Sequence, residues 1–216
     1  ESSNAMVPRV QEYRSLRWLK HAVHALQLQI PARVGFAKPN SENLERHSML
    51  VERLVEQRSG WMVLALVWDN EAQEAFRLVL PINAIVSWDD VLVDIPDGLK
   101  GALPFDWSHY VDQRFELAAG VVLDAEEQPV TLRIWFEMQT AMEYVAQPFH
   151  PSQDPKIERS GAGIVMQAYF VPNAPFRKWL LHHGATAQLL EPADLRESLG
   201  AEVQSLAASY SKMFGP

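Results

Sequence analysis

The feature that most constrains this chain is the run from Trp61 to Trp68, Trp-Met-Val-Leu-Ala-Leu-Val-Trp, which is wholly apolar. A strand with a hydrophobic residue at every position is typical of one buried on both faces. Polar turns flank it, Arg58-Ser59-Gly60 before and Asp69-Asn70 after. Such turns join neighbouring strands, so the sequence predicts three consecutive antiparallel strands between Arg46 and Leu80, with the outer two at 49–57 and 74–80.

Shorter elements are expected on both sides of these strands. Residues 33–37 and 84–88 are predicted strands, and 7–29 is a predicted helix with Pro8 in its first turn. An apolar residue recurs at every third or fourth position of that helix: Val10, Tyr13, Leu16, Leu19, Val23, Leu26 and Ile30. One helix followed by short strands with tight turns favours a small curled sheet or barrel.

The second half of the chain predicts a different layout. A connector is expected at 91–120, with a helix at 106–117, and regular patterning resumes at Val121. The expected strands are 130–136, 156–159, 163–171 and 186–190, and the expected helices are 139–146, 174–183 and 192–213. This order predicts an α+β sandwich with helices on one face of a sheet.

Composition excludes several classes of function. The chain has 216 residues, a formal charge of −8 and no cysteine, which removes disulfides and cysteine-based chemistry and fits a cytoplasmic location. No apolar run is long enough for a transmembrane helix, so no membrane partner is expected. The net negative charge argues against general binding of polyanions.

The sequence predicts no enzyme. His150, Ser152 and Asp154 lie close together, but no nucleophile-elbow motif accompanies them. His21 and His24 would share a helix face without a further metal ligand nearby. We therefore expect no catalytic residue, no metal and no cofactor.

Both halves of the chain resemble known domains. The first half is similar to a WYL domain at Gly60-Trp61-Met62-Val63-Leu64-Ala65, Phe76-Arg77-Leu78 and Ile85. The second half is similar to the WCX extension that follows WYL domains, at Leu132-Arg133-Ile134, Phe149-His150-Pro151-Ser152-Gln153, Trp179-Leu180-Leu181 with Gly184, Glu191-Pro192 with Leu195-Arg196, and Tyr210.

The resemblance implies a fold class and a set of boundaries. The expected class is α+β, with an N-terminal helix and a small Sm/SH3-like β-barrel followed by a ferredoxin-like α/β sandwich. Residues 1–5 read as a cloning remnant, 6–30 as a linking and dimerising helix, 31–90 as the WYL-like barrel, 91–120 as the connector and 121–216 as the WCX-like domain.

The resemblance also implies a function. WYL proteins are typically bacterial transcriptional regulators in which an N-terminal helix-turn-helix binds DNA and the barrel senses a nucleotide or nucleic acid. The expected function is thus the ligand-sensing, dimerising module of such a regulator, acting as a homodimer. It would contact DNA only through a missing or separate domain. The expected ligand-binding residues are Arg46, His47, Arg53, Arg58, Trp61 and Arg77.

One difference from the family keeps an alternative open. Glu74 and Leu80 stand where the family usually has arginines, and Phe36 stands where it commonly has a tyrosine. Two absent guanidinium groups remove strong bidentate donors for an anion. The alternative is a stand-alone protein-interaction scaffold of the same fold that binds no ligand. For either function, we expect the chain alone to bind duplex DNA weakly.

Overall fold

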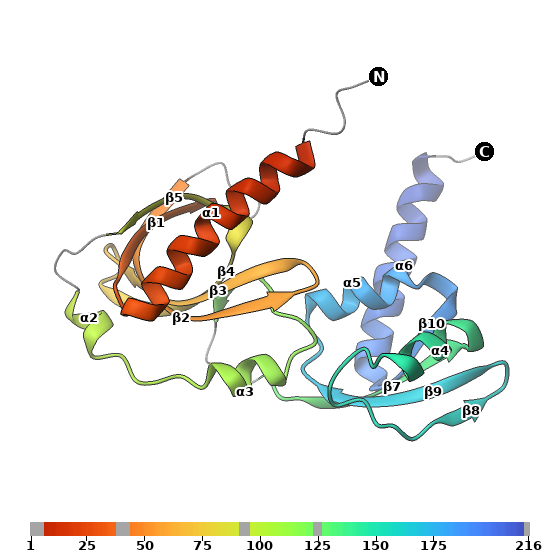
Figure 1. Ribbon diagram of the computed structural model, residues 1–216. Coiled ribbons are helices and arrows are strands. Elements are labelled where there is room, and N and C mark those ends of the chain that lie inside the picture. Colours follow the sequence, from red (N-terminus) through yellow and green to blue (C-terminus); the bar gives the residue numbers. More distant parts are fainter. Residues whose placement is uncertain (1–6, 38–43, 91–95, 123–126, 214–216) are drawn as a thin grey trace. The chain divides into compact units, whose positions relative to one another are not determined.

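The computed structural model describes residues 7–37, 44–90, 96–122 and 127–213, with side chains from Leu16 onward (Figure 1). The chain divides into two compact units, the first within residues 1–107 and 117–125 and the second within 108–116 and 126–216. Each unit has its own hydrophobic core. The expected connector, 91–120, is divided between the units instead of forming a separate segment.

The first unit is a curved antiparallel sheet with a long helix. Its elements are α1 (Val7–Leu28), β1 (Ala32–Ala37), β2 (Leu44–Gln57), β3 (Gly60–Asp69), β4 (Glu74–Pro81), the 3-10 helix η1 (Ile82–Ala84), β5 (Ile85–Asp90), α2 (Asp97–Lys100) and β6 (Gly120–Val122). The six strands form one sheet in the order β5-β1-β2-β3-β4-β6.

This sheet does not close into a barrel within the part of the chain that the structure describes. β5 returns to pair with β1, but the second edge of β4 pairs with β6 and not with β5. β6 is only three residues long and crosses a predicted boundary, because Gly120 ends the expected connector while Val121 and Val122 belong to the expected WCX-like domain. The expected closed Sm/SH3-like barrel is therefore not found, while the mixed α and β character is confirmed.

β3 is buried on both faces, as its apolar sequence predicts. All residues from Met62 to Val67 are buried. Val63, Ala65 and Val67 belong to the core, together with side chains of α1, β1, β2 and β4. On the other face, α2 packs on the sheet, and Gly98 of α2 lies so close to the Trp68 ring that any β-carbon there would overlap it.

α1 covers the sheet with a face that overlaps only part of the predicted stripe, of which Leu19 and Leu26 pack against the core. Trp18, Ala22 and Ala25 are buried in the core. Two residues of the predicted stripe, Leu16 and Val23, are instead exposed. The buried face lies to one side of the predicted stripe because small alanines let the helix backbone approach the curved sheet closely.

The second unit is a four-stranded antiparallel sheet with helices. Its elements are α3 (Trp107–Asp112), of which all but Trp107 belong to this unit, β7 (Val130–Glu137), α4 (Met138–Ala146), β8 (Glu158–Ser160), β9 (Gly163–Phe170), α5 (Ala174–His182), the 3-10 helix η2 (Gly184–Thr186), β10 (Ala187–Glu191) and α6 (Ala193–Met213). The strand order is β10-β7-β9-β8, and all neighbours are antiparallel.

The core of the second unit lies between one face of this sheet and α4, α5 and α6. The predicted alternation of β7 is confirmed, because Leu132, Ile134 and Phe136 are all buried. Ala141 of α4, Phe176 of α5 and Leu195 of α6 belong to the same core. This packing explains why the period-2 and period-3.6 patterns located these elements well.

α3 is shorter than the helix that the sequence predicted. It ends at Asp112, whereas the prediction continued to Leu117. Beyond it, Gln113 accepts a hydrogen bond from the backbone N–H of Val171 (2.7 Å), and Arg114 forms an isolated bridge with the same residue. After Asp112 the backbone therefore leaves the helix and pairs with Val171, the residue that follows β9 in the second unit.

α6 has a buried half and an exposed half. Leu195 and Leu199 pack in the core, but every residue from Gly200 to Met213 is exposed. The apolar stripe continues along the exposed half with Val203, Leu206 and Tyr210. In Figure 1 this half extends beyond the sheet of its own unit. The apolar stripe of α6 therefore continues past the part of the helix that packs in the core.

Candidate ligand-binding cavity

A cavity of about 490 Å³ opens at one end of the core of the first unit. Its walls are mostly apolar, and its charged groups are three carboxylates and one imidazole. The lining residues are Phe36, Glu45, His47, Asp69, Glu74, Phe76, Leu78, Val79, Leu80, Pro81, Ala84, Ala119, Gly120 and Val121. Clefts of this size with a few polar groups are the usual sites for small molecules.

Strand alternation places the cavity's inner wall. Phe76, Leu78 and Leu80 alternate along β4 and face the core of the sheet. Phe36 comes from β1, directly opposite Glu45 of β2 in the strand register. Strands β1, β2 and β4 thus bring the apolar wall and the charged residue Glu45 together.

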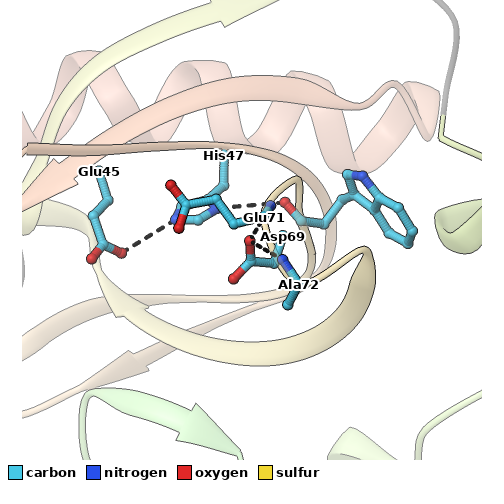
Figure 2. A network of polar contacts seen from close by, with 6 residues as sticks. Glu45, His47, Asp69, Glu71 and Ala72 are labelled. Carbon is cyan, nitrogen blue, oxygen red and sulfur yellow. Dashed lines mark hydrogen bonds and ion pairs between the residues drawn. The ribbon is translucent and has the colours of Figure 1, made fainter.

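His47 contacts both the aromatic side chains of the wall and a carboxylate at the opening of the cavity. Its Nε2 lies 3.2 Å from Oε2 of Glu45, and its Nδ1 lies 3.4 Å from the backbone oxygen of Trp68 (Figure 2). Its ring stacks on Phe36 at 5.7 Å and meets Phe76 edge-on at 6.1 Å. Both ring nitrogens therefore face acceptors, while the ring itself contacts two phenyl side chains.

Asp69 fixes the turn at the mouth of the cavity. Its Oδ1 accepts hydrogen bonds from the backbone N–H groups of Glu71 (2.8 Å) and Ala72 (3.2 Å), which Figure 2 shows. An aspartate that accepts from the backbone two residues on is a common way to stabilise a turn. The carboxylate is thus held at the junction of β3 and β4.

A second, polar cavity of about 470 Å³ involves the same end of the sheet. Its lining consists of Leu44, Glu45, Arg46, His47, Asp69, Asn70 and Glu71. Arg46 is the one arginine in this lining, against three carboxylates. Counted over the described lining residues, both cavities are consequently acidic in formal charge.

The predicted ligand-binding residues are not gathered around the apolar cavity. Of the predicted set, only His47 lines it, and Arg46 lines the polar cavity beside it. Arg53 is half-buried on β2, Arg58 is exposed at the β2–β3 turn, and Trp61 packs against the core. Ligand binding by this set stays a prediction.

The side chain of Arg77 lies on the other side of β4, where it contacts residues of the first unit. Its guanidinium carbon lies 4.6 Å from the centre of the Phe105 ring, and Nη2 donates to the backbone oxygen of Leu103. Its Nε lies 3.7 Å from Oε2 of Glu52. The same carboxylate oxygen accepts a hydrogen bond of 2.8 Å from Nε1 of Trp107. Arg77 thus helps to hold residues 103–107 on the first unit.

Four lining residues were not singled out from the sequence: Glu45, Asp69, Glu74 and Phe76. The period-2 alternation was a usable signal, because Phe76 shares a face of β4 with Leu78 and Leu80. The contribution of Asp69 had no such signal, since turn residues are usually interpreted only as breaks between strands.

His150 in the second unit uses both ring nitrogens in contacts within the fold. It is 3% exposed, its Nε2 donates to the backbone oxygen of Arg114 (3.2 Å), and its Nδ1 lies 2.7 Å from Oγ of Ser152. Burial lowers the pKa of His150, so the imidazole is held neutral. Asp154 instead accepts from the backbone N–H of Lys156 (2.8 Å), so these three residues do not form a catalytic triad.

His183 is part of an aromatic cluster in the same unit. Its Nε2 lies 2.8 Å from the Tyr144 hydroxyl, and its ring meets Trp179 edge-on at 5.0 Å. Burial is the main cause that lowers the pKa of His183, and the neighbouring His182 lowers it further. This histidine, too, serves packing.

Within the described residues, no group of three or more histidine, aspartate or glutamate side chains is arranged to hold a metal ion. Among the helices of that same part of the chain, none is long and apolar enough to cross a membrane.

Comparison with known proteins identifies part of the second unit. Residues 128–207 match the family model of the WCX domain. This match agrees with the similarity to a WCX extension that the sequence indicated at 121–216. No curated protein matches the chain.

Two solved structures are similar to the chain at low identity. A CRISPR Cas-related protein has 10% identity and a TM-score of 0.52, and the match covers 92% of this chain and 53% of that one. This likeness shows a shared fold alone. The proteasome accessory factor B/C (PafBC) of Arthrobacter aurescens has 13% identity over 97% of this chain and 28% of its own, with a TM-score of 0.36. The chain therefore spans about half of one structure and under a third of the other.

Proposed function

We propose that this chain is the ligand-sensing and dimerising module of a bacterial, cytoplasmic WYL-type transcriptional regulator. The match of residues 128–207 to the WCX domain carries the proposal, because the WCX domain is the extension that follows WYL domains. In this proposal the first unit corresponds to the WYL barrel and the second to a ferredoxin-like WCX domain. The chain order β7-α4-β8-β9-α5-β10 and the sheet order β10-β7-β9-β8 support the latter. The proposal assigns no catalytic step to the chain.

Dimerisation is proposed to occur with a second copy of this chain through α6. Its exposed stripe carries Val203, Leu206 and Tyr210, with exposed fractions of 48 to 58%. A groove of about 570 Å³ adjoins the stripe, and its lining includes leucines of α5, β10 and α6. A contiguous apolar surface of this kind usually marks an interaction site, and a self-complementary stripe beside a groove suits a two-fold dimer.

Sedimentation velocity of the whole chain tests this proposal. Wild-type protein at micromolar concentration is expected to sediment as a dimer, and Leu206→Glu as a monomer. Ala208→Glu is the matched control, because Ala208 is exposed on the opposite side of the same helix. A second variant, Leu16→Glu, tests the exposed residue of α1, which the sequence pattern suggested as the dimerising helix. A monomeric wild-type protein would contradict the proposal.

Nucleotide or single-stranded nucleic acid binding is the finer part of the proposal. The candidate residues outside the apolar cavity are Arg46, Arg53 and Arg58, with Trp61 able to stack a base. A melting-temperature screen with nucleotides and short single strands tests it, since a ligand that binds only the folded state raises the midpoint. Any stabilisation should be weaker in Arg46→Ala than in Glu71→Gln.

The alternative is a scaffold of the same fold that binds no nucleotide. One observation favours it: Arg77, a member of the predicted set, is engaged by Leu103, Phe105 and Glu52. The same screen decides between the two functions. No stabilisation by any nucleotide or oligonucleotide, combined with a stable dimer, is the result expected for the scaffold.

A further inference from the structure

The polar groups at the opening of the apolar cavity already have partners within the fold or face solvent. Oε2 of Glu45 lies 3.2 Å from Nε2 of His47, and Nδ1 of the same ring lies 3.4 Å from the backbone oxygen of Trp68. Asp69 accepts two backbone hydrogen bonds from its own turn (Figure 2), and Glu74 is exposed. A paired or solvated group gains little from a ligand, because each new bond replaces an existing one. Binding in this cavity therefore depends on its apolar wall.

The wall of the cavity presents large apolar side chains from two strands. Phe76, Leu78 and Leu80 alternate along β4, and Phe36 comes from β1. Phe36, Leu78 and Leu80 also belong to the core of the first unit, so packing behind the wall holds it in place. Moving apolar surface from water onto such a wall is favourable without any charged contact.

The loop that joins β1 to β2 adds no large apolar side chain to this wall. Residues 38–43 lie outside the described residues, and their sequence is Lys-Pro-Asn-Ser-Glu-Asn. Apart from Pro39, every side chain in it is polar or charged. The apolar contacts open to a ligand are consequently those of the described wall.

The size and shape of the space suit a molecule larger than one benzene ring. A cavity of about 150 Å³ accommodates benzene, and this one has a volume of about 490 Å³. His47 stacks on Phe36 and meets Phe76 edge-on, with ring centres 5.7 and 6.1 Å apart, and a further aromatic ring can add to such a set in either geometry. The lining also includes the small side chains of Ala84 and Ala119, which leave the space in front of these rings open.

We propose that this cavity binds an uncharged, mainly apolar small molecule that contains an aromatic ring. The ring lies against Phe36 and Phe76, and an aliphatic part extends along Leu78 and Leu80. This ligand differs in class and in place from a nucleotide, because the candidate arginines do not line the cavity. The inference goes beyond the proposed function and rests on it only in giving the bound molecule a regulatory meaning.

Titration of the whole chain with a series of uncharged probes, followed by protein NMR, tests this chemistry. Benzyl alcohol, 2-phenylethanol, 3-phenylpropanol and 4-phenylbutanol differ by one methylene at each step. Each added methylene is expected to strengthen binding about two- to fourfold, because apolar contact provides the affinity. The dissociation constant of 4-phenylbutanol is expected to be below about 1 mM. An affinity that does not rise along the series would overturn the proposal.

Two charged analogues of the longest probe test the preference for an uncharged molecule. At pH 7, 4-phenylbutylamine is positive and 4-phenylbutyrate is negative, and both are expected to bind more weakly than 4-phenylbutanol. The reason is that a charge loses hydration at the cavity without gaining an unpaired partner. Either analogue binding more than about tenfold tighter than the alcohol would contradict the proposal, because a difference of that size requires a charged contact.

Two wall variants locate the site. Ala84→Leu fills part of the space and is expected to weaken binding of 4-phenylbutanol at least about fivefold, while Phe76→Ala removes a wall contact and should weaken it about tenfold. Ala118→Leu is the matched control for the filling variant, because Ala118 is exposed and is not among the described lining residues; its effect should stay below about twofold. Circular dichroism checks that each variant is folded. Wild-type affinity in both folded wall variants would place the probe elsewhere and overturn the proposal.

The titration and the nucleotide screen concern different residues, so either proposal can fail alone. Trp61→Ala removes the side chain proposed to stack a base but does not line the cavity, so the affinity for 4-phenylbutanol should stay within about twofold of wild type. Binding of 4-phenylbutanol without stabilisation by any nucleotide would keep this inference and remove nucleotide sensing. Stabilisation by a nucleotide without binding of any phenylalkanol would remove this inference alone.

Discussion

Two aromatic regions of this molecule have similar components and opposite character. In the second unit, Phe136, Phe170 and Phe176 are fully buried, and the adjacent His150 satisfies both ring nitrogens within the fold. In the first unit, Phe36, Phe76 and His47 line a cavity with carboxylates at its mouth. The difference shows that composition alone does not separate a core from a site; what separates them is whether the space between the rings is filled.

The largest expected effect concerns the filled region. Phe170→Ala is expected to lower the free energy of unfolding by about 4 kcal/mol, because it leaves a void among packed rings. Phe76→Ala, at the wall of an existing cavity, should cost about 1 to 2 kcal/mol, since fewer contacts are lost. Urea unfolding followed by circular dichroism measures both. Equal losses would contradict the contrast between the regions.

A smaller effect is expected at the buried histidine. His150→Ala leaves the backbone oxygen of Arg114 and the hydroxyl of Ser152 without this partner, which should cost about 2 to 3 kcal/mol. His24→Ala is the control, because His24 is exposed on α1. Chemical denaturation of the two variants side by side checks the difference; a His150 variant as stable as the control would show that the buried bonds contribute little.

The lowered pKa of His150 predicts a pH dependence. At a pH between its folded pKa and the ordinary 6.5, the unfolded chain binds more protons than the folded one. Stability should therefore be full above pH 6.5 and fall as the pH decreases below it. His183, whose pKa burial also lowers, adds in the same direction. Melting temperatures between pH 5 and 8 should show a shallower decline for His150→Gln than for wild type.

The smallest expected effect lies outside both regions. Arg58→Ala, at the exposed β2–β3 turn, should change the free energy of unfolding by less than about 0.5 kcal/mol. Urea unfolding followed by circular dichroism measures this change beside that of Phe76→Ala. A loss as large as that of Phe76→Ala would show that the exposed turn contributes as much to stability as the cavity wall.

The regular elements were predictable because their patterns are local. The apolar run of β3 and the alternation of β7 located buried strands within a residue or two. The predicted stripe of α1 was less accurate, since Leu16 and Val23 are exposed while Trp18 and Ala22 are buried. Which face of a helix packs depends on the curvature of its partner sheet, and the helix sequence does not contain that information.

The site was harder to predict because it depends on strand pairing. Glu45 reaches Phe36 through the β1–β2 register, and Asp69 lies at a turn that local rules treat as a break. His47 was the one predicted residue that lines the apolar cavity. Arginines were predicted to bind the ligand because a guanidinium group suits phosphate. Arg77, however, lies on the opposite side of β4 from Phe76.

The most direct test of the contrast between the two aromatic regions is a crystal structure of the whole chain under xenon pressure, because xenon enters empty apolar cavities. Anomalous scattering locates the xenon without reference to any expected position. The account predicts a xenon peak against Phe36, Phe76 and Leu78, and none among Phe136, Phe170 and Phe176. Xenon found among the rings of the second unit, with none in the cavity of the first, would contradict it.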